Sequence, residues 1–151
     1  MNIGILNESN KIENRAGLSP SSVSMLVEKG HTIYVQAGAG LRAGYSNEEY
    51  SSLGANIVFT KDEIFGRSDV VLNIAPLDEE ESHLVKEGQV LFGFHHLAVA
   101  KRKVIEELLK KKVTIIGYEI VQDDEGELPF IESLSEIAGQ MCVAIAGHYL
   151  Q

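Results

Sequence analysis

Polar side chains follow four of the predicted strands, at the edge where parallel α/β sheets bind their ligands. Arg15 follows the first strand and Asn73 ends the fourth, while His95 and His96 follow the fifth and Glu119 follows the sixth. The guanidinium of an arginine suits a carboxylate because it donates two parallel hydrogen bonds, and an imidazole can take up or release a proton near neutral pH. Together these residue types predict a small carboxylic acid as the ligand.

Each of these residues also has a purely structural interpretation. Arg15 can pair with Glu8 or Glu13 of its own loop. Because successive side chains of a strand point to opposite faces, we expect at most one of His95 and His96 to face a ligand. The glutamate after the sixth strand can cap a neighbouring helix as readily as it can touch a ligand. Residue types alone therefore leave the function open.

Short apolar runs alternate with amphipathic helical stretches from one end of the sequence to the other. This alternation is typical of an α/β fold with a mostly parallel, Rossmann-like (flavodoxin-like) sheet and helices on both of its faces. The apolar runs predict strands at residues 2–6, 32–36, 56–59, 69–74, 89–94 and 113–118. Capping residues and glycine stops predict helices at residues 19–30, 46–54, 60–67, 101–112 and 133–151.

The last of these helices opens at Ser133 and Glu136, which have the spacing of a capping box, and no stop signal follows before the final residue. We expect it either to pack on its own sheet or to connect to a further domain or a second subunit, because its small residues allow close helix packing at some cost in helix propensity. Met141 and Cys142 are expected in the core. The acidic run at residues 77–82 is expected to be the solvated first turn of another helix.

The stretch "QAGAGLRAG" at residues 36–44 has glycines that could hold a nucleotide phosphate. A dinucleotide fingerprint, however, sits in the first βα turn and opens a helix directly, so that the helix N-terminus faces the pyrophosphate. Here Gly44 is followed by Tyr45, and Ser46 then begins a separate, capped helix after the second strand. We interpret the stretch as a tight loop whose glycines need positive φ angles, and expect the fold to lack the dinucleotide glycine fingerprint.

Composition excludes several classes of function. The 151 residues suit one domain, and the net charge of -9 argues against a nucleic-acid surface. There is no stretch long and apolar enough to span a bilayer and no secretory signal, so we expect a soluble protein. Cys142 is the single cysteine, which excludes an internal disulfide and favours the cytoplasm, and the scattered histidines predict no metal site.

Several segments resemble, in order and spacing, the N-terminal part of the alanine dehydrogenase and pyridine nucleotide transhydrogenase family. The likeness covers essentially all 151 residues. Its most specific pieces are Glu13-Asn14-Arg15 followed by Ser19-Pro20, Gly38-Ala39-Gly40 with Gly44 and Tyr45, and Ser135-Glu136-x-Ala138-Gly139.

The resemblance implies two Rossmann-like domains, one for the substrate and one that binds NAD. This chain would be the substrate-side domain of an NAD-dependent amino-acid dehydrogenase, and NAD would be bound mainly by a domain or subunit that is not in this chain. By the resemblance, Arg15 binds the carboxylate of a small amino or keto acid, His96 acts as the catalytic acid/base, and Ser135 lies near the nicotinamide. Because the family is usually oligomeric, a homo-oligomer is expected.

The sequence departs from the family at one position. Ala75 stands where the family has a lysine that contacts the substrate, and Asn73 is the nearest polar residue. The segment "APLDEE" is more similar to the transhydrogenase branch of the family, although that branch usually lacks the histidine of "FHHLA". Two other functions therefore stay open: a transhydrogenase-type subunit without an amino-acid site, and a stand-alone, non-catalytic domain that binds a carboxylate or a partner.

Overall fold

The structure, a computed structural model, describes residues 1–8 and 12–150. Its strands are β1 (Asn2–Ile5), β2 (Thr32–Gln36), β3 (Asn56–Val58), β4 (Val70–Leu72), β5 (Val90–Gly93) and β6 (Thr114–Gly117). Its helices are α1 (Pro20–Glu28), α2 (Asn47–Ser52), α3 (Lys61–Arg67), α4 (Glu79–Leu84), α5 (Arg102–Lys110) and α6 (Pro129–Tyr149), with short 3-10 turns η1 (Leu41–Ala43) and η2 (Tyr118–Ile120). Every predicted strand is present, with ends that differ from the expected ones by at most two residues.

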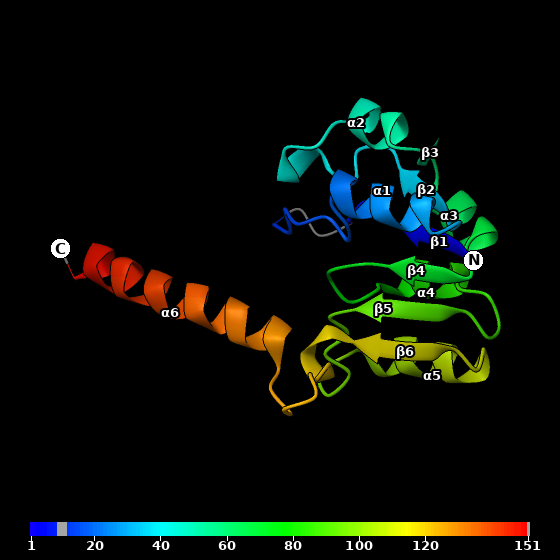
Figure 1. Cartoon of the computed structure of the whole chain (residues 1–151). Helices are drawn as coiled ribbons and strands as arrows, with labels where there is room; N and C mark the ends of the chain where they lie inside the picture. Colours follow the sequence, from blue (N-terminus) through cyan, green and yellow to red (C-terminus); the bar gives the residue numbers. More distant parts are fainter. Residues whose placement is uncertain (9–11, 151) are drawn as a thin grey trace. The chain divides into compact units, whose positions relative to one another are not determined.

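The strands form one sheet in the order β3-β2-β1-β4-β5-β6 (Figure 1). Four neighbouring pairs are parallel, and in the centre Ile3 lies beside Ile33 of β2 and Val70 of β4. This is the order of Rossmann sheets, whereas flavodoxin-like sheets have the order 2-1-3-4-5. The Rossmann-like fold is thus confirmed. The narrower flavodoxin-like description is wrong, because β3 lies outside β2 and β1 pairs with β4 instead.

Helices cover both faces of the sheet, as predicted. α1 and α2 pack on β2 and β3, where Val23 and Tyr50 join Ile33 and Val35 in one core. Tyr34 points to the other face, because side chains alternate along β2, and packs against the second core, to which α3 and α5 contribute. The sheet is therefore packed on both faces, and its strand ends can hold side chains in fixed positions.

The capping signals fix where most of the helices begin. Ser46 with Glu49 and Thr60 with Glu63 form complete capping boxes at α2 and α3. The box predicted at Ser133 is wrong. α6 begins earlier, at Pro129, and the Ser133 hydroxyl donates to the Pro129 carbonyl at 2.9 Å. A proline can open a helix because its missing N–H needs no partner there.

The chain divides into two compact units, Met1–Ile116 and Gly117–Gln151. In the second unit, the ring of Tyr118 in η2 packs on Phe130 of α6 at 4.8 Å between centroids. α6 has no buried residue, Met141 is 55% exposed and Cys142 is exposed, so the expectation that both belong to the core is wrong. The final residue of the predicted helix, Gln151, lies outside the described residues.

Within the described ranges, no helix has the length and apolar character needed to cross a membrane.

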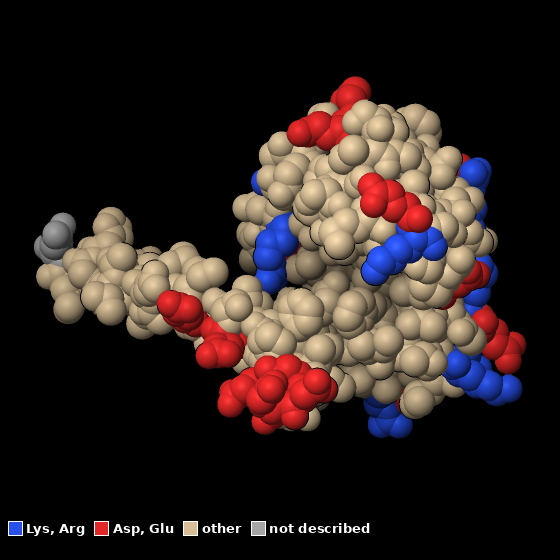
Figure 2. Space-filling view, viewed as in Figure 1, with Lys and Arg blue, Asp and Glu red and all other residues tan. Residues whose placement is uncertain are grey.

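Charged side chains are distributed in small separate patches on the face shown in Figure 2. Acidic residues outnumber basic ones, 22 to 13. Over the described residues visible on this face, Lys and Arg do not join into the continuous basic surface that binding to nucleic-acid phosphates requires.

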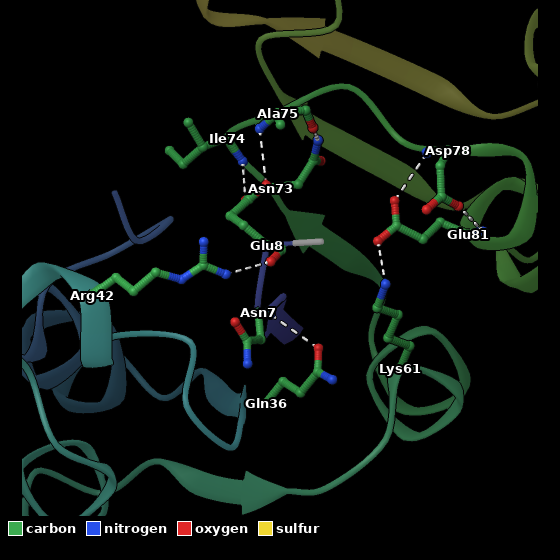
Figure 3. A network of polar contacts seen from close by, with 10 residues as sticks. All are labelled: Asn7, Glu8, Gln36, Arg42, Lys61, Asn73, Ile74, Ala75, Asp78 and Glu81. Carbon is green, nitrogen blue, oxygen red and sulfur yellow. Dashed lines mark hydrogen bonds and ion pairs between the residues drawn. The ribbon is translucent and has the colours of Figure 1, made fainter. Parts of the chain in front are cut away.

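The acidic run opens α4, but it is not solvated throughout. Glu81 is 5% exposed. Lys61 of α3 donates to its Oε1 at 2.6 Å, and the N–H of Asp78 donates to its Oε2 at 3.0 Å (Figure 3). The expectation of a solvated turn is therefore wrong for Glu81, which joins two helices through a mostly buried ion pair.

Candidate functional site

The loops after β1, β2, β4 and β5 lie at one edge of the sheet, because these parallel neighbours end on the same side (Figure 1). The strand order reverses between β1 and β4, which is where Rossmann sheets form their ligand crevice. The chain leaves β1 toward α1 on one face and leaves β4 toward α4, which packs beside α3 and α5 of the other. Arg15, Asn73, Ala75 and His96 all follow strands at this edge.

Arg15 is held by the acidic residue two positions before it. Glu13 accepts the backbone N–H and the Nε–H of Arg15 through Oε1, each at 2.9 Å, and an Nη2–H through Oε2 at 2.7 Å. Hydrogen bonding to Arg15 lowers the pKa of Glu13, and the same bond raises the pKa of the guanidinium. Of the two acidic partners considered from the sequence, Arg15 pairs with Glu13.

Glu13 does not occupy all of the hydrogen-bond donors of the Arg15 guanidinium. A guanidinium carries five N–H donors, and Glu13 takes its Nε side. The Arg15 side chain is 47% exposed, and its Nη1 has no hydrogen-bond partner among the described residues. Its outer edge, formed by Nη1 and the second Nη2–H, can therefore still bind a carboxylate with two parallel hydrogen bonds.

The two adjacent histidines have opposite environments. His95 is buried, with an exposed fraction of 4%, whereas His96 is exposed. His96 also has a positive φ of 43°, which is uncommon for residues other than glycine. Only His96 of the pair is exposed, and the expectation that at most one of the two faces a ligand stays a prediction.

Phe94 connects the two residues of the predicted chemistry, and sequence reasoning missed it. The guanidinium carbon of Arg15 lies 5.4 Å from the centre of the Phe94 ring. The imidazole of His96 stacks on the same ring, with 6.1 Å between centroids and 18° between planes. The structure therefore brings Arg15 and His96 together around one aromatic ring. The available signal was an aromatic residue at the end of β5, two positions before His96.

Asn73 is almost completely buried, with an exposed fraction of 1%. Its Nδ2 donates to the carbonyl of Ala75 at 2.6 Å, and a side chain at Gly93 would collide with it. Its Oδ1 has no hydrogen-bond partner among the described residues. Asn73 therefore shapes the loop after β4 directly, and its role as a substrate contact stays a prediction that depends on this one acceptor atom.

Glu8 joins the loops after β1 and β4, and it was considered from the sequence only as a partner of Arg15. Its carboxylate accepts the N–H groups of Ile74 and Ala75, the second at 3.1 Å (Figure 3). Burial raises the pKa of Glu8, and the two backbone N–H groups oppose that effect. Ala75 is held on both sides through its backbone, and its methyl group offers no charge to a ligand.

Most backbone N–H groups of the glycine stretch donate hydrogen bonds within the protein. Those of Ala39, Leu41, Ala43, Gly44 and Tyr45 donate to carbonyls within the stretch or just before it, and that of Gly38 donates to Asn47 Oδ1 at 2.9 Å. Gly38 and Gly44 have positive φ angles, as predicted, but Gly40 has a φ of -96°, so the expectation is wrong for that glycine. A phosphate cradle needs N–H groups that point at the ligand, and these six N–H groups instead donate to acceptors within the protein.

Ser135 lies in α6, in the second unit of the chain, and is exposed. Glu119 lies in η2 of the same unit. Neither residue belongs to the unit that contains Arg15, Phe94 and His96. The candidate site built above therefore rests on the first unit alone.

Comparison with known proteins identifies relatives of the whole chain. A family model described as "Alanine dehydrogenase/PNT, N-terminal domain" matches residues 4–138. An alanine dehydrogenase of Methanococcus maripaludis is 38% identical and one of Staphylococcus saprophyticus is 41% identical, each over all of this chain and 40% of the relative. The chain thus spans well under half the length of these relatives.

Two solved structures share the fold. An L-alanine dehydrogenase has a TM-score of 0.91 at 36% identity, over 99% of this chain and 41% of that one. A transhydrogenase from Sinorhizobium meliloti has a TM-score of 0.72 at 24% identity, over 80% of this chain and 35% of that one. The second likeness shows the fold alone.

Proposed function

The chain belongs to the family of alanine dehydrogenase/PNT N-terminal domains, and from this we propose that it is the substrate-side domain of an NAD-dependent amino-acid dehydrogenase. One observation carries the proposal. Arg15 and His96 come from loops of different strands and pack on the same ring of Phe94. We propose that the first group binds a carboxylate and the second transfers a proton, the two roles that oxidative deamination of an amino acid requires on the substrate side.

In this function the outer edge of the Arg15 guanidinium binds the carboxylate of the amino or keto acid. Glu13 keeps the guanidinium in one orientation, because it holds the backbone N–H and the Nε–H at once. The bound acid then has its reacting carbon directed along the Phe94 ring toward the imidazole. His96 accepts or donates the proton of the substrate's nitrogen or oxygen as the bond to that carbon changes order.

The hydride of this reaction goes to NAD, which supplies the redox chemistry when it is bound. We propose that a domain or subunit outside this chain holds most of the nucleotide, since most N–H groups of the glycine stretch donate to acceptors within the protein. Ser135 is the proposed contact of this chain with the nicotinamide side. Its hydroxyl is exposed on α6 and can donate or accept one hydrogen bond.

The experiment compares variants of the chain assembled with its NAD-binding domain, with NADH formation from L-alanine as the readout. His96→Asn is the sharpest change, because asparagine tolerates the positive φ while it removes the acid/base group. We expect kcat to fall by about 10² to 10⁴-fold. Lys112→Asn is the matched control, since among the described residues Lys112 is the other non-glycine residue with a positive φ, 50°. Full activity in His96→Asn would refute the proposed role.

Arg15→Lys tests the carboxylate contact in the same assay. Lysine keeps the charge but loses the planar fork, so we expect a higher KM for the amino acid and an unchanged KM for NAD. Equal effects on both KM values would contradict a contact specific to the acid.

A second candidate function is favoured by the position of Ala75. Without an ammonium at this place, a substrate loses a charge-assisted contact of about 1.5 to 3 kcal/mol. A transhydrogenase-type subunit, which exchanges hydride between nucleotides, has no need of that contact. If this is the function, Arg15→Lys and His96→Asn leave hydride exchange between nucleotides unchanged, whereas an amino-acid dehydrogenase loses its turnover.

We also propose that the protein works in the cytoplasm as a homo-oligomer. The single cysteine supports the first statement, because it is free and the chain can form no internal disulfide. Exposed apolar side chains along α6, such as Ile137, Val143 and Ile145, support the second. Sedimentation of the complete protein measures its oligomeric state.

A further inference from the structure

Arg42 holds two backbone carbonyls of the loop after β1. It lies in η1, within the glycine stretch after β2. Its Nη2 donates to the carbonyl of Glu8 at 2.9 Å, and its Nη1 donates to the carbonyl of Glu13 at 3.0 Å. Figure 3 shows the first of these contacts, with the Arg42 side chain extended from its own loop toward Glu8.

The two carbonyls are separated by residues 9–12 of the chain and belong to the segment that leads to Arg15. A guanidinium suits this contact, because its two terminal nitrogens carry diverging N–H donors in a fixed planar arrangement. The end of the segment at Glu8 is also held by Ile74 and Ala75, through its carboxylate. At Glu13, the backbone contact with Arg42 is the one that links the segment to the loop after β2.

The position of Glu13 determines the position of the Arg15 guanidinium. The Glu13 carboxylate binds Arg15 at its backbone N–H, its Nε–H and an Nη2–H. Any displacement of the Glu13 backbone therefore moves the plane of the guanidinium, and with it the stacking on Phe94 at 5.4 Å. The contacts run in sequence from Arg42 to Glu13, from Glu13 to Arg15, and from Arg15 to the ring.

We infer that Arg42 is a positioning residue for the Glu13–Arg15 pair, and that it keeps the Arg15 guanidinium in the orientation that binds a carboxylate. Arg42 acts by restricting the loop after β1 to the conformations in which Glu13 can hold Arg15. The effect on ligand affinity rests on the proposed function, whereas the effect on the Glu13–Arg15 pair does not.

The glycine stretch at residues 36–44 carries Arg42 and positions its side chain. Most of its backbone N–H groups donate hydrogen bonds within the protein, which restricts the loop that carries Arg42. Gly44 ends η1 with a φ of 87°. The stretch thus contributes to the site through Arg42.

The first test measures hydrogen exchange of the Arg15 Nε–H and backbone N–H by NMR in this chain. We expect Arg42→Ala to speed exchange at both groups by about tenfold, because loosening of the loop frees them from Glu13. Arg42→Lys has a single nitrogen and should give an intermediate rate. Arg102→Ala on α5 is the matched control, since Arg102 is a 91% exposed arginine paired with Glu106, and should change neither rate.

The second test titrates the same variants with pyruvate, a small keto acid, and follows the Arg15 signals. If only about a tenth of the Arg42→Ala molecules keep the binding conformation, the apparent Kd rises about tenfold. A wild-type chain that does not bind pyruvate contradicts the proposed function, and the exchange rates then still decide whether Arg42 positions the pair.

Two results would overturn the inference. One is unchanged exchange at Arg15 in both Arg42→Ala and Arg42→Gln, the second variant being included in case the first does not fold. The other is faster exchange with unchanged pyruvate affinity, because Arg42 would then hold the loop without serving the ligand.

Discussion

Gly40→Ala tests whether the glycine stretch is a packed structural loop. Gly40 has φ -96° and ψ -10°, angles that alanine adopts without strain. The substitution therefore adds one methyl group and changes no backbone preference. An added Cβ would lie 2.6 Å from Cε2 of Tyr50 and 2.8 Å from Cβ of Tyr45. Carbon atoms in contact are usually about 3.5 to 4.0 Å apart, so one of the neighbours must move by roughly 1 Å.

Neither neighbour can move without loss. Tyr50 is 0% exposed, and its hydroxyl donates to the carbonyl of Leu18 at 2.7 Å. Overpacking of this kind costs about 1 to 3 kcal/mol, and loss of the hydroxyl bond adds about 1 kcal/mol. We therefore expect Gly40→Ala to lower the free energy of unfolding by about 2 to 4 kcal/mol.

Urea unfolding followed by circular dichroism measures this change. For a slope of about 2 kcal/mol per molar urea, the midpoint should fall by about 1 to 2 M. Gly66→Ala is the matched control, because Gly66 lies inside α3 and an added Cβ there meets nothing within 4 Å. It should raise stability by about 0.5 to 1 kcal/mol.

A second measurement identifies Tyr50 as the group that moves. Burial raises the pKa of Tyr50 to about 12, ahead of smaller contributions from Tyr45 and Glu49. If the new methyl group pushes the ring toward solvent, that pKa falls toward the ordinary value of about 10 in an absorbance titration. A midpoint equal to that of the wild type, with the Tyr50 pKa unchanged, would refute the packing argument.

The remaining predictions concern two charged pairs. Lys61→Met should lower the free energy of unfolding, measured in urea, by about 1 to 3 kcal/mol, because it leaves the buried Glu81 carboxylate without the Lys61 ammonium. The loss should stay below that of a fully buried pair, since the Lys61 side chain is 29% exposed. Lys103→Met, at an 81% exposed lysine, should change stability by less than about 0.5 kcal/mol, and an equal loss in both variants would contradict the argument. Bonding to Arg15 lowers the pKa of Glu13, so its stabilising contribution is present above the ordinary carboxyl pKa of 4.5 and is lost as the pH falls through the lowered pKa. The stability difference between wild type and Glu13→Gln should therefore shrink with acidification in a pH series of urea midpoints, and a difference that grows instead would reverse the sign of this linkage.

Local signals predicted the fold well, because each strand and most helix starts are determined by neighbouring residues. Most of the apolar runs are strands of the parallel sheet with buried side chains, and Ser46 or Thr60 caps a helix through the residue three positions later. The start of α6 was missed because two local signals compete there. Pro129 and Ser133 can each open a helix, and the sequence alone does not rank them.

The candidate site was predicted less completely, since its geometry depends on contacts between distant residues. Arg15 and His96 could be chosen by residue type. Phe94, which joins them, looked like one more apolar strand residue. The carboxylate of Glu8 binds a backbone 66 residues away, and the guanidinium of Arg42 binds one 34 residues away. Backbone acceptors and donors leave no trace in residue type, so neither contact has a signal in the sequence.

The contact between Glu8 and Ile74 has a consequence for the order of folding. It spans 66 residues and can form only after β1 has paired with β4, because that pairing brings the two loops together. Closing so long a segment is slow compared with forming α1 or pairing β1 with β2. During refolding, the loop that carries Arg15 should therefore gain protection from hydrogen exchange later than the β1–β2 pair. A chain with a nearly complete sheet would then pass through a state that cannot yet bind a carboxylate.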